Sequence, residues 1–175
     1  MKLITGILSI GLVLIVVTSQ IGICAEIGEN KFARNASNSL IPFVVVGELS
    51  LYSKGKTGRK EALQGAKALA ATYLATELLK ITVRERRPNR SSLNSFPSEH
   101  TSLSFAMATV LSDYQPETTL VSYGVASTIG WSRVEMGEHR WHEVFAGAAL
   151  GYFIAKSFTR QPINEAQGLD FIWKW

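Results

Sequence analysis

Three short segments of the chain hold the residues whose types and spacing could do chemistry. Residues 80–88 are rich in arginine, residues 95–101 are polar, and residues 132–143 contain two of the three histidines. Arginine offers a planar fork of donors to a tetrahedral oxyanion, and lysine offers a point charge. Phosphoryl transfer depends mainly on positioning and on this kind of electrostatic stabilisation. Taken together, the three segments predict a site that handles phosphate.

The first segment places two cations near the end of a predicted helix. Lys80 and Arg87 are seven residues apart, which is about two helical turns, so both would project from one side. Pro88 disfavours helical geometry at the residue before it, and we expect the helix to end there. By itself, a basic helix end is also typical of a solvated face.

The second segment predicts a helix N-terminus that can bind an anion. Ser98 is a natural N-cap, which leaves the backbone N–H groups of residues 99 and 100 without helical partners. Such an end attracts phosphate. His100 lies in the predicted first turn, where it could donate a proton to a leaving group. An ordinary cap with a surface histidine is the alternative.

The third segment contains a histidine that could act as a nucleophile. His139 and Glu143 have i, i+4 spacing, so on a helix the carboxylate would accept from one imidazole nitrogen and leave the other free to attack. A structural His–Glu pair is an alternative. A metal site of His139, His142 and Glu143 is another, which the absence of a cysteine partner disfavours.

The chain resembles the type 2 phosphatidic acid phosphatase (PAP2) superfamily in three motifs: Lys80-x6-Arg87-Pro88, Pro97-Ser98-Glu99-His100 and Ser132-Arg133-x5-His139-x3-Glu143. That superfamily includes bacterial acid phosphatases, lipid phosphate phosphatases and vanadium haloperoxidases, and the resemblance spans about residues 60–158. It implies a helical bundle and hydrolysis without a metal or another cofactor.

The resemblance also implies a role for each motif residue. Phosphate would be bound by Lys80, Arg87, Arg133, the Ser98 hydroxyl and the Glu99 amide. His139 would be the nucleophile that forms a phosphohistidine, His100 the acid that protonates the leaving alcohol, and Glu143 the group that orients His139.

Two residues depart from the family pattern, which usually has Gly at position 99 and Asp at position 143. Glu143 keeps the charge on a longer side chain, so we expect its role to survive. A carboxylate at Glu99 would repel phosphate, so we expect its side chain to turn away and only its N–H to face the site. We expect activity to be retained.

Apolar residues recur at helical spacing through most of the chain and predict the elements that position these motifs. The predicted helical segments are Ile41–Leu51, Glu61–Ile81, Glu99–Leu111 and Trp141–Phe158. Residues 54–59, 87–97 and 113–117 carry the breaks between them. The sequence therefore predicts an all-α bundle of five or six helices with a PAP2/haloperoxidase-like fold.

Length and charge limit the other classes. The 175 residues suit one domain, and Cys24 alone excludes a disulfide framework. The net charge of +4 is local: residues 80–90 hold five basic residues and one acidic residue, which leaves 13 of each elsewhere. This confinement to one motif argues against nucleic acid as a partner.

The N-terminus predicts export. Residues 3–25 are uncharged, and we interpret residues 1–25 as a signal peptide or a single N-terminal anchor. Residues 26–175 would then form one PAP2-like domain, periplasmic or associated with the inner membrane. The oligomeric state is left open.

The function that these observations favour is a metal-independent phosphatase. Its substrates would be lipid phosphates, such as phosphatidate or isoprenyl diphosphate, or small phosphate esters. A vanadate-dependent haloperoxidase and a catalytically weakened, membrane-associated binding module are the alternatives.

Overall fold

The described part of the chain is a bundle of α-helices. The computed structural model describes residues 31–159, in which no strand occurs. The helices are α2 (Lys31–Asn38), α3 (Leu40–Tyr52), α4 (Gly55–Val83), α5 (Glu99–Tyr114), α6 (Thr119–Glu135) and α7 (Trp141–Thr159), with a short 3-10 turn, η1 (Pro116–Thr118), before α6. The predicted all-α bundle is confirmed, and the predicted export segment 1–25 lies outside the described residues.

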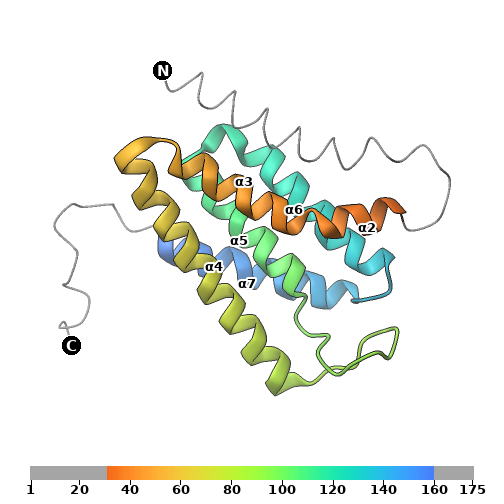
Figure 1. The fold of residues 1–175 in the computed structure, drawn as a ribbon. Coiled ribbons are helices and arrows are strands. Elements are labelled where there is room, and N and C mark those ends of the chain that lie inside the picture. Colours follow the sequence, from red (N-terminus) through yellow and green to blue (C-terminus); the bar gives the residue numbers. More distant parts are fainter. Residues whose placement is uncertain (1–30, 160–175) are drawn as a thin grey trace, which may run out of the picture.

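Helix α5 forms the centre of the bundle. It packs against α3, α4, α6 and α7, which surround it in Figure 1. Its middle is almost completely buried, from Ala106 to Leu111. The sequence indicated one apolar stripe on this helix, but α5 is buried on several sides. Because α5 begins at Glu99, this central position fixes the second motif within the bundle.

Helix α7 lies unusually close to α5 through two glycines. A Cβ atom added at Gly147 would lie 2.6 Å from the Ser98 carbonyl oxygen, and one at Gly151 would lie 2.0 Å from that of Ser102. No side chain fits at these distances, so glycine is required for the approach. The contact holds the first turn of α7, with Glu143, against the start of α5.

Helix α4 differs from its prediction at both ends. It begins at Gly55, so the predicted break at residues 54–59 is reduced to a turn at Ser53 and Lys54. It ends at Val83, where Arg84 adopts left-handed geometry with φ of 51° and donates its N–H to the Lys80 carbonyl at 3.1 Å. The helix therefore stops well before Pro88, and Arg87 lies in the following loop instead of on the helix with Lys80.

Helix α2 was not predicted, because its sequence is short and mostly polar. It packs on α6, and Ala33, Ala36 and Ser37 are buried there. This places Ser37 beside the C-terminal end of α6, where Arg133 lies.

Candidate active site

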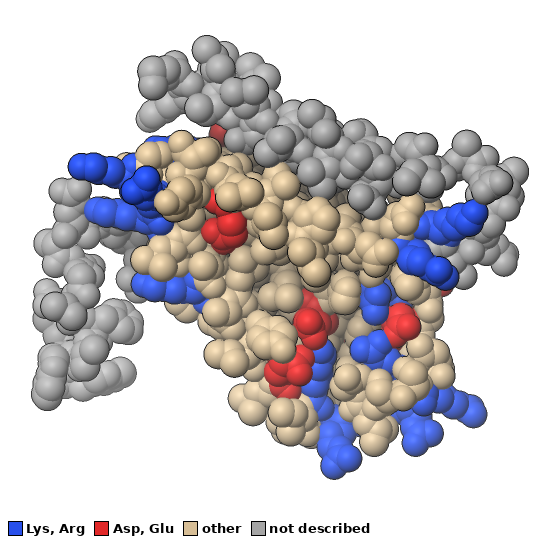
Figure 2. All heavy atoms as spheres, in the orientation of Figure 1, with Lys and Arg blue, Asp and Glu red and all other residues tan. Residues whose placement is uncertain are grey.

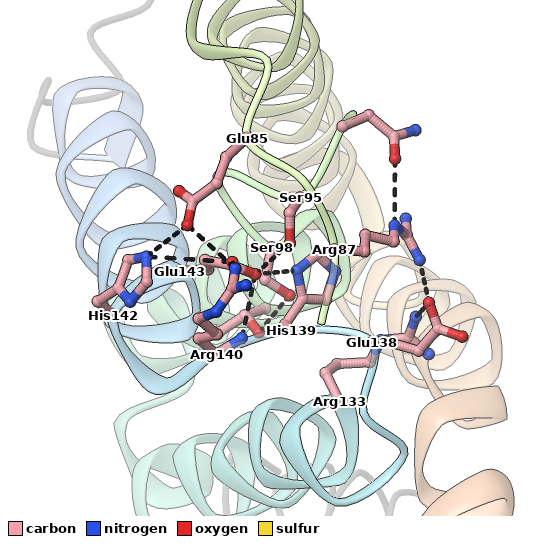
Figure 3. Close-up of polar contacts among 12 residues, drawn as sticks. Glu85, Arg87, Ser95, Ser98, Arg133, Glu138, His139, Arg140, His142 and Glu143 are labelled. Carbon is pink, nitrogen blue, oxygen red and sulfur yellow. Dashed lines mark hydrogen bonds and ion pairs between the residues drawn. The ribbon is translucent and has the colours of Figure 1, made fainter. Parts of the chain in front are cut away.

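The structure brings the three predicted motifs to one end of the bundle. Lys80 contacts Glu99 across the start of α5, and the backbone N–H of Ser98 donates to the Glu143 carbonyl at 3.1 Å. His100 lies within the electrostatic reach of Lys80, Arg87, Arg133 and His139. All the residues proposed from the sequence therefore surround one site, part of which is drawn in Figure 3.

The central pair of the site is His139 and Glu143. The Nδ1 atom of His139 lies 2.8 Å from Oε2 of Glu143, and both side chains are buried. The sequence predicted this contact along one helix. In the structure His139 precedes α7, and its backbone N–H donates to the Arg133 carbonyl at 3.1 Å. The turn between α6 and α7 thus orients the imidazole, and Glu143 comes from the first turn of α7.

The Glu143 carboxylate accepts hydrogen bonds from other groups besides His139. Its Oε2 also accepts from the Ser95 hydroxyl at 2.5 Å and from the Arg140 backbone N–H at 3.1 Å, and its Oε1 accepts from the Arg140 guanidinium at 3.0 Å. Burial by itself raises the pKa of Glu143, but the bonds from Ser95, His139 and Arg140 outweigh it and lower that pKa. Glu143 is therefore a carboxylate and accepts the proton of His139 Nδ1–H.

The same environment keeps the His139 ring neutral. Burial lowers its pKa, with the nearby cations Arg133 and Arg87 acting in the same direction, although Glu143 opposes them. With Nδ1 directed at the carboxylate, the second nitrogen, Nε2, carries the free lone pair. A neutral imidazole with a fixed tautomer can attack an electrophile.

His100 lies in the first turn of α5, and burial lowers its pKa to about 4, assisted by the positive charges of Arg133, Lys80 and Arg87. It is therefore neutral at pH 7 in the unliganded site. A bound phosphate brings negative charge beside it, which favours the protonated form. His100 is thus placed to hold a proton only when an anion is bound.

Each proposed phosphate-binding cation is paired with a carboxylate in the unliganded site. Lys80 contacts Glu77 at 2.7 Å and also Glu99. Arg87 and Arg133 share the carboxylate of Glu138, which Figure 3 shows between the two guanidinium groups.

Two further side chains position the arginines. The Arg133 guanidinium donates to the Ser37 hydroxyl at 2.6 Å, and Arg87 Nε donates to Asn94 at 3.1 Å. Arg133 is buried, and its Nε has no hydrogen-bond partner among the described residues. An anion that reached this arginine would find an unsatisfied donor.

The expectation for Glu99 was wrong. Its carboxylate does not turn away from the site, because it binds the Lys80 ammonium. Burial acts to raise the pKa of Glu99, but the Lys80 hydrogen bond and charge outweigh burial and lower it. Glu99 is ionised and forms an ion pair with Lys80, which is one of the cations that the resemblance assigns to phosphate binding.

Ser98 occupies the predicted N-cap position, with extended backbone geometry, but its hydroxyl makes no capping bond. The hydroxyl instead accepts from Thr101 Oγ1 at 2.9 Å. Its own hydrogen is therefore available to an incoming oxygen.

The alternative metal site is only partly assembled. Glu85, His142 and Glu143 offer ligand atoms within 4.8 Å of one another, whereas His139 is not a member of this group. The Arg140 guanidinium binds both carboxylates, so a cation already lies among these residues. This arrangement does not favour a metal ion, and the expectation that the site needs none stays a prediction.

Sequence reasoning missed several residues of this site: Ser37, Ser95, Glu138 and Arg140. Ser95, Glu138 and Arg140 lie inside or beside the motifs, but only the contacts made by distant parts of the chain reveal what they do. Ser37 lies in α2, which was not predicted, and no pattern in the sequence indicates that it contacts Arg133.

Comparisons with known proteins bear on the family and the fold of this chain. A family model described as the PAP2 superfamily matches residues 61–166. A lipid A 1-phosphatase of Porphyromonas gingivalis is 30% identical in an alignment of 155 residues, and the alignment covers 77% of this chain and 34% of the relative. The chain thus spans about a third of the length of that curated relative.

A solved structure shares the fold. The crystal structure of a transmembrane PAP2-type phosphatidylglycerolphosphate phosphatase from Bacillus subtilis matches with a TM-score of 0.62 and 20% identity, and the match covers 95% of each chain. The family model covers more than half of the sequence and spans all three motifs. On these grounds, the chain belongs to the PAP2 superfamily.

Proposed function

We propose that the protein is a phosphatase that hydrolyses phosphate monoesters through a phosphohistidine on His139, without a metal ion. The observation that carries this proposal is the buried His139–Glu143 pair beside Lys80, Arg87 and Arg133. A neutral imidazole with one free nitrogen supplies the nucleophile. The three cations supply charge for the equatorial oxygens of the transferred phosphoryl group.

The first step transfers the phosphoryl group to the enzyme. Nε2 of His139 attacks phosphorus while the bond to the ester oxygen breaks, and His100 gives its proton to that oxygen, so the alcohol leaves neutral. The Nδ1 proton stays hydrogen-bonded to Glu143, which stabilises the positive charge that develops on the ring.

The second step regenerates the enzyme. Water attacks the phosphohistidine and gives one proton to His100, which breaks the P–N bond and releases inorganic phosphate. His139 returns to its neutral tautomer. His100 keeps its proton while phosphate is bound, loses it when the phosphate leaves, and takes up a proton again when the next phosphate ester binds. Throughout both steps, Ser98 and Arg133 are placed to bind phosphate oxygens.

Lipid phosphates are the substrate class that we favour. Both named relatives act on lipid phosphates according to their descriptions, lipid A in one and phosphatidylglycerolphosphate in the other. Trp141 begins α7 two residues after His139, is half exposed, and stacks on the exposed Phe145. These rings provide an apolar surface close to the proposed nucleophile, which suits an acyl chain better than a sugar.

Exposed apolar and basic side chains at the end of α4 support association with a membrane surface. Within residues 31–159 no helix is both long and apolar enough to cross a bilayer. Exposed apolar side chains nevertheless follow one another along the last turns of α4, at Leu74, Leu78 and Ile81, and α4 packs against α7. Arg84, Arg86 and Arg90 are exposed just beyond them. Apolar side chains bordered by cations are typical of a surface that binds anionic lipid.

The test is a substrate panel with a chelator present. Phosphatidate, an isoprenyl diphosphate, a sugar phosphate and p-nitrophenyl phosphate are compared for phosphate release by wild type and His139→Ala. We expect turnover that survives the chelator, is fastest on the lipids and is lost in the variant. Absence of turnover on every ester would refute the proposal, and equal rates on lipid and sugar phosphates would refute the lipid preference.

A further inference from the structure

Glu138 occupies the position where the two arginines of the site converge. Its Oε2 contacts Arg87 Nη1 directly and lies 3.8 Å from Arg133 Nη2. Figure 3 shows the two guanidinium groups directed at this one carboxylate from opposite sides. Carboxylate and phosphate oxygens are equivalent ligands for an arginine fork. The Glu138 oxygen therefore marks a position that fits an anionic oxygen of the substrate.

The acidic residues cancel the charge that the motif would otherwise offer to an anion. Lys80, Arg87 and Arg133 bring three positive charges, and Glu77, Glu99 and Glu138 bring three negative charges in contact with them. The formal charge of this group is therefore zero. Figure 2 likewise shows Asp and Glu side chains among the Lys and Arg side chains at the end of the molecule where α4 runs into its loop. A phosphate that enters must compete with carboxylates that are already bound.

Phosphate can replace Glu138 at the two arginines if only the Glu138 side chain moves. The backbone N–H groups of Glu138 and His139 both donate to the Arg133 carbonyl, at 3.0 and 3.1 Å, and Gly137 makes the preceding turn with φ of +66°. The backbone beside the nucleophile is thus fixed. The Glu138 side chain is about a quarter exposed, at 25%, so it can rotate into solvent while that turn stays in place.

We propose that Glu138 is an internal competitor for the phosphate site: its carboxylate holds Arg87 and Arg133 in the resting enzyme and is displaced when the substrate phosphate binds. This inference rests on the proposed function, because it assigns those arginines to phosphate. It makes Glu138 a determinant of substrate affinity. A monoester with weak additional contacts leaves the carboxylate in place, whereas a substrate whose other groups also bind displaces it.

The experiment compares the affinity of inorganic phosphate for wild type, Glu138→Gln and Glu135→Gln by isothermal titration calorimetry at pH 7. Glu135→Gln is the matched control, because it removes the same charge three residues away. Glu135 is exposed, and within residues 31–159 it forms no ion pair with Arg87 or Arg133. Losing one charge-assisted competitor should tighten phosphate binding about tenfold in Glu138→Gln. Glu135→Gln should bind phosphate as wild type does.

A structural role for Glu138 gives the opposite result. If its carboxylate is needed to hold the arginines together, Glu138→Gln and the second variant Glu138→Ala bind phosphate no better than wild type or more weakly, and the inference is overturned. Thermal unfolding shows whether each variant is folded, and Glu138→Ala replaces Glu138→Gln in the comparison if the latter is not. Turnover of all four esters of the substrate panel by wild type is measured in parallel. A binding change without turnover would refute the proposed function alone, and turnover without the binding change would refute this inference alone.

Discussion

His139 Nδ1 lies 2.8 Å from Oε2 of Glu143, and that carboxylate is completely buried. The contact joins the turn after α6 to the first turn of α7, and the N–H of Ser98 ties the start of α5 to the same point. It therefore determines both the tautomer and the direction of the imidazole. Loss of this contact should affect catalysis more than folding.

Replacing Glu143 with Gln should lower kcat about 10²- to 10⁴-fold, because the neutral amide no longer fixes the Nδ1–H tautomer or stabilises the charged ring. Glu143→Asp keeps the charge but is one methylene shorter, so its loss should be smaller. Steady-state kinetics on p-nitrophenyl phosphate measure both, with thermal unfolding as the check on folding. Full activity in Glu143→Gln would show that His139 does not depend on this carboxylate.

The buried His100 should make stability depend on pH. Its pKa is about 4 in the folded protein and near 6.5 in the unfolded chain. Between these values the unfolded chain binds a proton that the folded protein does not, so the free energy of unfolding falls as pH falls through this window. In His100→Asn the slope should be shallower by up to about 1.4 kcal/mol per pH unit.

Urea unfolding in phosphate-free buffer, repeated from pH 7.5 to about pH 4 to span that window, measures the two slopes. Parallel curves for wild type and His100→Asn over the whole range would contradict the low pKa of His100.

Glu99 should weaken phosphate binding through Lys80. Glu99→Gln removes a charge that is bound to the Lys80 ammonium, so the KM for phosphate esters should fall several-fold while the folded structure is kept. Glu99→Gly, which restores the usual family residue, should lower KM in the same direction. If KM rises in both variants, the carboxylate helps to bind substrate and our account of it is wrong.

The close approach of α5 and α7 should not tolerate a methyl group. In Gly151→Ala the new Cβ would lie 2.0 Å from the Ser102 carbonyl oxygen, so the helices must separate, at a cost of about 1–3 kcal/mol in the free energy of unfolding. Gly124→Ala on α6 is the matched control, because nothing lies within 4 Å of its Cβ. That change should stabilise the helix by about 0.5–1 kcal/mol.

Chemical unfolding of the two alanine variants provides the comparison, and kcat should fall only in Gly151→Ala, since α7 carries Glu143. A Gly151→Ala protein as stable as Gly124→Ala would mean that the helices are not held at this distance.

The sequence was informative where a pattern is local. Helical spacing predicted α5 and α7, and the motifs predicted that Lys80, Arg87, His100 and His139 belong to one site. The end of α4 was predicted too far along the chain. Pro88 is a recognisable helix-ending residue, whereas no residue type in the sequence indicates the left-handed turn at Arg84. Lys80 and Arg87 therefore do not share one helix face as predicted, because Arg87 lies in the loop that follows α4.

Contacts between distant residues could not be predicted. Ser37 binds Arg133 across 96 residues, and Arg87 binds Glu138 across 51. Such pairs depend on how the helices pack, which spacing along the chain does not encode. The same reason explains why Glu99 was expected to turn away: the position of Lys80 beside it follows from the contact between α4 and α5.

The most direct test of the account is the identity of the phosphorylated residue during turnover. Wild-type protein is mixed with a phosphate ester, quenched at alkaline pH in the steady state and mapped by mass spectrometry. We expect a phosphoryl group on the His139 imidazole, and none in His139→Ala. A protein that turns over substrate while carrying the phosphoryl group on another residue, or on no residue at any quench time, would contradict the account.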